Sequence, residues 1–418
     1  MGGEMDSEQL YREREKRVVD AIALKVPDRV PLTVSMGFFV AKYTGYTNQE
    51  VMYDPDKLWD AQWKTTHDFV QDMERDPYGL TLLGPILDRI GYSQLQWAGR
   101  GLPANAAYQF VEGEYMKPEE YDHFLMDPSD FMVRVYLPRI CTELTGLAKL
   151  PSLHSVMSYS IGLPFGLAPF TDPDVQKALD VLRQAGNDSV HVASYSKRYR
   201  ERARAEGFPT QWGGFTQAPF DALGDYFRGT RGIMLDMYRR PAKIEKACER
   251  LLPIMLDLAN SGFKASGNPR IFIPLHKGLD GFMSLDQFKR FFWPSFRELM
   301  IQMIDLGMIP SPFWEGDCTS RLDVIKDVPG GKALYKFEST DLIKAKEILG
   351  DRICIRGGMP ISTLITGTRE DIKKSCKHII ETVGKGGGFI MDASTGMDDV
   401  SPENVRAFFD YTREFGVY

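Results

Sequence analysis

The chain has few cysteines, and they follow no recognisable pattern. Its 418 residues include five of them, Cys141, Cys248, Cys318, Cys354 and Cys376. Their number is odd, their spacing is irregular and no C-x-x-C pair occurs, so a disulfide framework is not expected. The sequence also shows no signal-peptide core and no run of about 20 apolar residues that could cross a bilayer. We therefore expect a cytoplasmic protein without a membrane partner.

Long runs of one charge are missing as well. Lys and Arg total 51 and Asp and Glu total 57, which gives a net charge of −6. Without a long basic run, this balance argues against nucleic acid as the main partner. No repeat of about 20–50 residues and no low-complexity segment is visible. With 43% hydrophobic and 26% charged residues, the composition is that of an ordinary globular protein.

Short apolar runs that end in polar residues are the main pattern that is present. Between residues 271 and 395 four such endings occur, LHKG (275–278), FWEGD (313–317), KFESTD (336–341) and ICIRGG (353–358). Helix-like segments lie between the later endings, with Pro or Gly at their ends. This alternation predicts an α/β fold, and we expect a (β/α)8 TIM barrel with N-terminal helical additions. We expect one domain over residues 1–418, with an irregular excursion around residues 85–151.

Polar residues at these endings are the candidate functional groups. The carboxyl ends of parallel barrel strands open on one face, where catalytic residues gather. We therefore expect His276, Glu315, Asp317, Glu338 and Cys354 to be neighbours in space although they lie far apart in the sequence.

Aromatic residues next to predicted strand ends indicate the shape of the ligand. The chain is 12% aromatic and contains 19 methionines, and a lining of such residues would suit a bulky apolar or planar ligand. Asp221 lies in a loop of small residues and is expected to contact the ligand; alternatively, it caps the following helix. The rings expected around the barrel mouth are Phe38, Phe39, Tyr43, Trp212 and Trp314.

The last third of the chain resembles a known family. GGGFI (386–390), followed by SPENV (401–405), resembles the last strand and helix of the uroporphyrinogen decarboxylase superfamily. GGMP (357–360) resembles the turn after its seventh strand, and Gly278 with FMS (282–284) and Pro294 resembles its fourth-strand ending and helix. The resemblance runs from about Arg29 to the C-terminus, and it implies a single (β/α)8 barrel.

One branch of this superfamily, the porphyrin decarboxylases, carries Arg-Gln-Ala-Gly-Arg-Tyr-Leu-Pro after the first strand, where its arginines meet substrate carboxylates. This chain has Met-Gly-Phe-Phe-Val at 36–40 instead, an apolar loop without fixed cations. The His expected after the last strand is also missing, and Thr395 or its neighbours stand in its place. Decarboxylation of a porphyrin-like or other carboxylic acid is therefore the alternative function, with Arg228, Arg231 and Arg356 as anchors.

The other branch comprises the cobalamin-dependent methyltransferases. Its thiol-activating members carry His-x-Cys-Gly at the fifth-strand ending, where this chain has FWEG (313–316), so the closer resemblance is to the O-demethylase first components. This resemblance implies transfer of a methyl group from a methoxylated aromatic compound to the cobalt of a corrinoid. The cobalamin-binding pattern Asp-x-His-x-x-Gly is absent, so a partner corrinoid protein is implied. A catalytically silent scaffold for the corrinoid or its carrier is a third hypothesis, and the sequence leaves a homodimer open.

Three of the candidate residues form a plausible zinc site. His276, Glu315 and Cys354 offer one nitrogen, one oxygen and one sulfur donor, a set that zinc accepts with a fourth position left open. Without zinc, Glu315 would give a proton to the ether oxygen, with His276 as its partner. Asp317 and Glu338 would stand behind them as catalytic carboxylates. Structural roles are the alternative, His276 as a core histidine, Cys354 as a small hydrophobe and Glu338 as an ion-pair partner.

Overall fold

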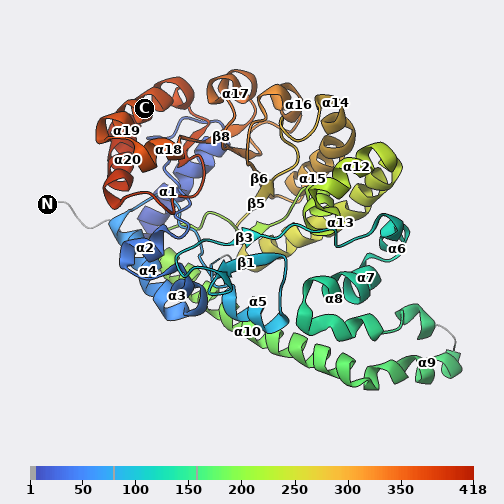
Figure 1. Ribbon diagram of the computed structural model, residues 1–418. Helices are drawn as coiled ribbons and strands as arrows, with labels where there is room; N and C mark the ends of the chain where they lie inside the picture. Colours follow the sequence, from blue (N-terminus) through green and yellow to red (C-terminus); the bar gives the residue numbers. More distant parts are fainter. Residues whose placement is uncertain (1–5, 79–80, 157–158) are drawn as a thin grey trace.

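A six-stranded parallel sheet stands at the centre of the computed structural model, which describes residues 6–78, 81–156 and 159–418 (Figure 1). Its order is β4-β5-β6-β7-β8-β9, so neighbours in the sheet are consecutive in the chain. Parallel neighbours need a crossover connection, and helices supply it here. The predicted α/β fold is therefore confirmed. The strands are β4 (Gly214–Phe215), β5 (Arg270–Leu275), β6 (Ile309–Trp314), β7 (Leu334–Phe337), β8 (Cys354–Met359) and β9 (Phe389–Ala393).

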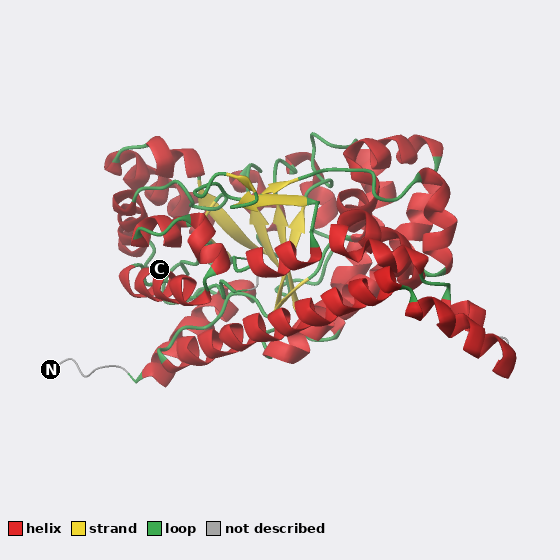
Figure 2. Ribbon diagram, turned by 60° about the horizontal axis from the view of Figure 1, so that its bottom comes forward, coloured by secondary structure: helices red, strands yellow, loops and turns green. Residues whose placement is uncertain are grey.

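Helices surround the sheet on its outer side (Figures 1 and 2). The longer helices are apolar along one stripe, which packs against the sheet layer. In α19 (Arg369–Ile379), for example, Ile372, Cys376 and Ile379 are buried at helical spacing. The helices that follow β4 are α11 (Pro219–Ala222), α12 (Gly229–Arg239), α13 (Pro241–Ser266), α14 (Leu285–Gln287), α15 (Trp293–Asp305), α16 (Leu322–Ile325), α17 (Leu342–Leu349), α18 (Ile361–Thr366), α19 (Arg369–Ile379) and α20 (Pro402–Phe415).

Two short extended segments from the N-terminal part of the chain adjoin the two edges of the sheet. Leu32 forms a parallel bridge with Met391 of β9, and Glu74 forms one with Thr210, just before β4. The backbone N–H of Asp72 donates to the carbonyl of Leu32 at 2.9 Å. Backbone pairing thus leads from one edge strand, through both segments, to the other edge.

Helix α1 (Ser7–Ile22) packs where the strands begin. It starts after Asp6, whose carboxylate accepts a hydrogen bond from the N–H of Glu8, the usual N-cap arrangement. Its buried residues Val18, Ala21 and Ile22 belong to one apolar cluster with Leu334 and Cys354, the first residues of β7 and β8. This end of the sheet is therefore covered.

The excursion expected around residues 85–151 consists of short elements, followed by the long helix α10 (Pro173–Ala205), which runs along one side of the molecule (Figure 2). A small sheet pairs β1 with β2 and with β3. No helix in the described ranges is long and apolar enough to span a bilayer. The remaining elements are α2 (Phe39–Thr44), α3 (Asn48–Tyr53), α4 (Pro55–Asp68), α5 (Gly84–Ile90), β1 (Leu95–Ala98), β2 (Gly101–Leu102), β3 (Gln109–Phe110), α6 (Tyr121–Met126), α7 (Pro128–Phe131), α8 (Leu137–Ile140) and α9 (Tyr159–Leu167).

Candidate active site

A cavity of about 850 Å³ lies at the end of the sheet where the strands finish. Its volume is within the range of about 300–1,000 Å³ that is usual for small-molecule sites. Strand ends and the loops after them form most of its wall, and the excursion covers it with residues 107–112. The polar side chains that line it include Arg75, Gln217, Asp225, His276, Glu315 and Lys336.

Aromatic rings make up much of the remaining wall. Of the five rings predicted at the mouth, Phe38 and Trp212 line the cavity. Phe272 of β5 and Phe313 of β6 join them, with ring centroids 5.4 Å apart for Trp212 and Phe272 and 6.5 Å apart for Phe272 and Phe313. Tyr108, Phe110, Phe215 and Tyr226 complete this lining. The cavity therefore suits a flat apolar group, but mainly through rings that the sequence did not single out.

The other three predicted rings, Phe39, Tyr43 and Trp314, lie away from the cavity, and this part of the prediction is wrong. Phe39 is fully buried and stacks on Tyr43, with centroids 5.6 Å apart. Trp314 is fully buried and packs against rings of α15 and the turn before it, including Phe296. Side chains of a strand alternate between its two faces, so Phe313 faces the cavity and Trp314 the helices.

His276 stands at the cavity wall between two carboxylates. Its Nδ1 lies 2.6 Å from Oδ2 of Asp225, and its Nε2 lies 3.6 Å from Oε2 of Glu315. Burial opposes the charged imidazolium, but the contacts with Asp225 and Glu315 outweigh it and raise the pKa of His276 to about 11. His276 is therefore a cation at neutral pH, held by Asp225 and within reach of Glu315.

Asp221 holds the backbone of His276 and Lys277 in position. It is fully buried, and its carboxylate accepts hydrogen bonds from the backbone N–H of His276 at 3.0 Å and of Lys277 at 2.9 Å. The Nζ of Lys277 in turn lies 2.9 Å from Oδ1 of Asp225. Asp221 does not line the cavity, so the structure makes it a positioning residue rather than the ligand contact that was predicted. Asp225 itself lies on a π-helical turn at Leu223–Arg228, a rare geometry that is common at functional sites.

The three predicted catalytic carboxylates occupy different surroundings. Glu315 lines the cavity. Glu338 is half-buried behind it, and burial together with the charge of Glu315 raises the pKa of Glu338. Asp317 is exposed and accepts hydrogen bonds from the N–H and hydroxyl of Thr319. Asp317 therefore caps the turn after β6 and lies outside the cavity lining, contrary to its predicted placement.

Cys354 does not join His276 and Glu315. It is the first residue of β8, fully buried in the apolar cluster beneath α1, and burial raises the pKa of its thiol. The run Ile353–Ile355 reads like a strand end, but the strand continues through two glycines to Met359. Among the residues that the structure describes, no three His, Cys, Asp or Glu side chains are placed to hold a metal ion. The predicted zinc ligand set is therefore not assembled.

Arg75 is a cavity residue that sequence reasoning did not select. It follows the short segment at 72–74 and lines the cavity with its long polar side chain. Within the described residues its guanidinium forms no hydrogen bond or ion pair, and burial lowers its pKa. The sequence feature that could have identified Arg75 is its place in the run Met73–Pro77. This strand ending is too short to be recognised from its pattern of apolar residues. A half-buried cation without a partner is suited to an anionic group on a ligand.

Glu74, the neighbour of Arg75, has a buried carboxyl group whose protonation state can be tested through protein stability. It is fully buried, and burial raises the pKa of its carboxyl from 4.5 to about 8. Between these values the unfolded chain loses this proton while the folded chain keeps it, so the contribution of Glu74 to stability falls as pH rises.

We expect Glu74→Gln to be more stable than the wild type near pH 8, by at least about 1 kcal/mol, and similar to it near pH 5. Urea unfolding at both pH values measures this difference. The exposed Glu347→Gln is the control, with no change expected at either pH. Equal destabilisation of Glu74→Gln at both pH values would contradict a neutral, buried Glu74.

Sequence comparisons with known proteins relate the chain to one family. The family model "Uroporphyrinogen decarboxylase (URO-D)" matches residues 150–415. A uroporphyrinogen decarboxylase from Chlorobium luteolum is 24% identical over 184 residues, 43% of this chain and 51% of that protein. One from Chlorobaculum parvum is 22% identical over 249 residues, 58% of this chain and 67% of that protein. The chain thus spans about half the length of the first of these relatives.

A solved structure extends the likeness over nearly the whole chain. A methyltransferase from Methanosarcina mazei superposes with a TM-score of 0.62 at 16% identity, covering 96% of this chain and 98% of that one. At this identity the two proteins share a fold.

Proposed function

Because the chain belongs to the uroporphyrinogen decarboxylase family, we propose that it is an enzyme of that family which transfers a methyl group. The donor is a methoxylated aromatic compound, and the acceptor is the cobalt of a partner corrinoid protein. The fold that the chain shares with a methyltransferase is consistent with this proposal. We also infer that the six strands and the segments at 30–34 and 72–74 form one closed (β/α)8 barrel domain, since backbone pairing connects them.

The cation of His276 beside a ring-lined cavity is the observation that carries this proposal. An aryl methyl ether is difficult to cleave because its oxygen leaves with a negative charge. When the methyl group passes to the cobalt, that oxygen must receive a proton or a hydrogen bond. His276 offers its Nε2 on the side of Glu315, at 3.6 Å from the carboxylate, while Asp225 holds Nδ1. The rings of Phe272, Phe313 and Trp212 would hold the aromatic group.

No step of this proposal uses zinc, because Cys354 lies among apolar residues at the start of β8. Metal content tests this choice. Suppose that the purified protein contains stoichiometric zinc and that both His276→Ala and Glu315→Gln lose it. This result would support a zinc ion at the site as the group that polarises the ether oxygen.

Decarboxylation of an acid is the second candidate, and Arg75 is the observation that favours it. Two of the anchors predicted for it are already engaged. Arg228 pairs with Asp236 and Glu114, and Arg356 pairs with Asp392. Arg231 is exposed and does not line the cavity. Within the described residues Arg75 is the one arginine that lines the cavity. A single arginine suits a substrate with one carboxylate better than a porphyrin with several.

An anaerobic assay separates these functions. The protein is mixed with 4-methoxybenzoate or methoxybenzene and with a panel of reduced corrinoid proteins, and phenol product, methylated corrinoid and carbon dioxide are measured. Phenol and methylated corrinoid without carbon dioxide support the proposal. Carbon dioxide alone would select the decarboxylase. Tight corrinoid binding without turnover of any substrate would instead favour a scaffold.

Arg75→Met should weaken binding of 4-methoxybenzoate about tenfold or more, since hydrogen bonds to charged groups contribute about 1.5–3 kcal/mol. Binding of methoxybenzene should not change, because it carries no anion. Isothermal titration measures both affinities without any corrinoid. The exposed Arg352→Met is the matched control. Equal affinity of wild type and Arg75→Met for 4-methoxybenzoate would rule out a contact between Arg75 and the carboxylate of the ligand.

A further inference from the structure

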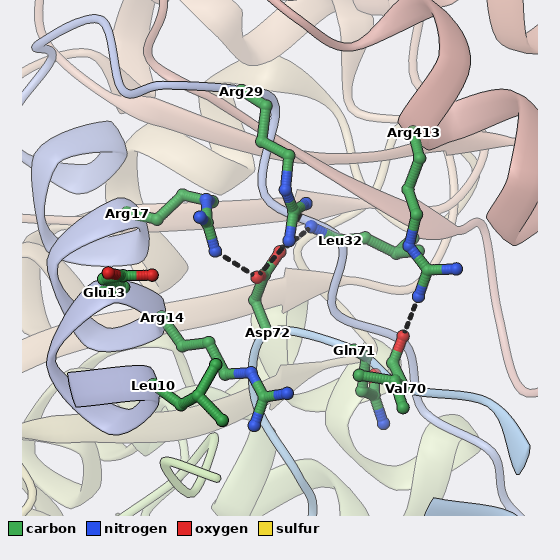
Figure 3. Close-up of a pocket in the computed structure, with 10 residues that line it drawn as sticks. All are labelled: Leu10, Glu13, Arg14, Arg17, Arg29, Leu32, Val70, Gln71, Asp72 and Arg413. Atoms are coloured by element: carbon green, nitrogen blue, oxygen red, sulfur yellow. Dashed lines mark hydrogen bonds and ion pairs between the residues drawn. The ribbon is translucent and has the colours of Figure 1, made fainter. Parts of the chain in front are cut away.

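A second cavity, of about 180 Å³, lies at the opposite end of the sheet, where the strands begin (Figure 3). Helix α1, the segments around Leu32 and Asp72, and helix α20 form its wall. Four arginines line it, Arg14 and Arg17 from α1, Arg29 from the chain before Leu32, and Arg413 from α20.

Two of these arginines are already paired. The Nη1 of Arg17 lies 2.6 Å from Oδ1 of Asp72, and its Nη2 lies 2.6 Å from Asp28. The Nη2 of Arg29 lies 2.7 Å from the same Oδ1 of Asp72. Asp72 is fully buried, and its other oxygen accepts from the N–H of Leu32 at 2.8 Å. The Nη1 of Arg29 donates to that second oxygen as well, at 3.0 Å. Asp72 therefore accepts four hydrogen bonds and has no capacity left for a third arginine.

The other two arginines have only neutral acceptors. Arg14 donates to the carbonyl of Gly207 at 2.6 Å, and Arg413 donates to the carbonyl of Val70. Within the described residues neither forms an ion pair. Figure 3 shows Arg14 entering the cavity from α1, and Arg413 extending from α20 to the carbonyl of Val70. Arg14 is half-buried, whereas Arg413 has one exposed side on α20. Partial desolvation lowers the pKa of both guanidinium groups, and the charge of Arg29 acts in the same direction.

Arginines outnumber carboxylates in the wall of this cavity, four to two, with Asp72 and Glu13 as the two acids. Asp28 lies behind Arg17, and the charge of Asp410 acts on Arg413 from outside the wall. A tetrahedral oxyanion would add negative charge inside the cavity, and guanidinium groups match its oxygens with paired N–H donors. The cavity is smaller than the range of about 300–1,000 Å³ that is typical for larger ligands. It has room for a phosphoryl group and a few more atoms.

We propose that this cavity is a binding site for a phosphate-type oxyanion, either free phosphate or the phosphoryl group of a small metabolite. Its ligands are Arg14 and Arg413, which form no ion pair within the described residues. The site is separate from the methyl-transfer cavity and does not depend on the proposed function. Bound anion would connect α1, Asp72 and α20, so it should stabilise the folded chain. Gln71 lines both cavities, which gives the two sites one shared residue.

Isothermal titration and thermal unfolding of the full chain, with inorganic phosphate and glycerol 3-phosphate at constant ionic strength, test the site. We expect saturable binding and a higher unfolding temperature than in chloride. Arg14→Gln and Arg413→Gln should each weaken binding about tenfold or more. Arg12→Gln, exposed on the same helix, should bind like the wild type. Arg75→Gln should also bind normally, which would assign the anion to this cavity and not to the other.

Each outcome has a definite meaning. Binding of phosphate but not of glycerol 3-phosphate identifies free phosphate, and binding of both identifies a phosphoryl group. No saturable binding of either probe would overturn the proposal. So would wild-type affinity in both Arg14→Gln and Arg413→Gln. Circular dichroism confirms folding of each variant, and Arg14→Lys, which keeps the charge, provides a second measurement at that position.

Discussion

His276→Ala should lower the rate of methyl transfer by a factor of about 100 to 10,000, the usual contribution of a proton-donating side chain. The reason is that the departing oxygen would lose the cation that stands beside it, between Asp225 and Glu315. Anaerobic single-turnover kinetics with a reduced corrinoid protein measure the rate. His378→Ala is the matched control, since His378 is exposed on α19 and does not line the cavity. A rate within twofold of wild type in His276→Ala would refute its role.

The dependence of the rate on pH gives a second measure of the same residue. The pKa of His276 is about 11, so its cation persists through neutral pH and is lost only as pH rises through that value. Asp225→Asn removes the contact that raises the pKa of His276 most, so this pKa should fall toward its ordinary value of about 6.5. The alkaline limb of the rate profile should then move to lower pH. A variant that lowers the rate equally at every pH would show that Asp225 acts only on structure.

Asp392→Asn should destabilise the protein by about 3–5 kcal/mol, the usual cost of leaving buried charges without a counter-charge. Asp392 is fully buried in β9, with the Nζ of Lys336 at 2.7 Å and the Nε of Arg356 at 2.9 Å from its Oδ2. Both cations are themselves buried. The midpoint of urea unfolding measures the loss.

A surface pair provides the comparison for Asp392. Asp323 is exposed and pairs with Lys326 at 2.8 Å, so Asp323→Asn should change stability by no more than about 0.5 kcal/mol. Adding Lys336→Met to Asp392→Asn should recover part of the loss, because one unpaired charge is then removed. A loss below about 1 kcal/mol in Asp392→Asn would mean that water reaches these charges in the folded state.

Strand endings could be predicted where an apolar run stops at a polar residue. His276 and Glu315 follow directly after β5 and β6, and the structure brings them together as expected. Cys354 was misplaced because β8 continues through Gly357 and Gly358, which have positive φ values of 130° and 108° and interrupt the apolar run without ending the strand. Composition alone does not distinguish such a strand from a turn.

Other features depend on information that the sequence does not carry locally. The choice between Phe313 and Trp314 rests on which face of β6 points inward, and a shift of one residue reverses it. Arg75 follows a segment too short to show any periodicity. Arg14 and Arg413, near opposite ends of the chain, meet in one cavity only through tertiary packing.

The bridge between Leu32 and Met391 also constrains the order of events during synthesis. A nascent chain emerges from the ribosome with its N-terminal residues first. Leu32 can pair with the segment at Asp72 early, but its other side has no partner until β9 has been translated. An unpaired strand edge can pair with another chain and promote aggregation. Newly made protein should therefore be most dependent on chaperones until β9 has left the ribosome and paired with Leu32.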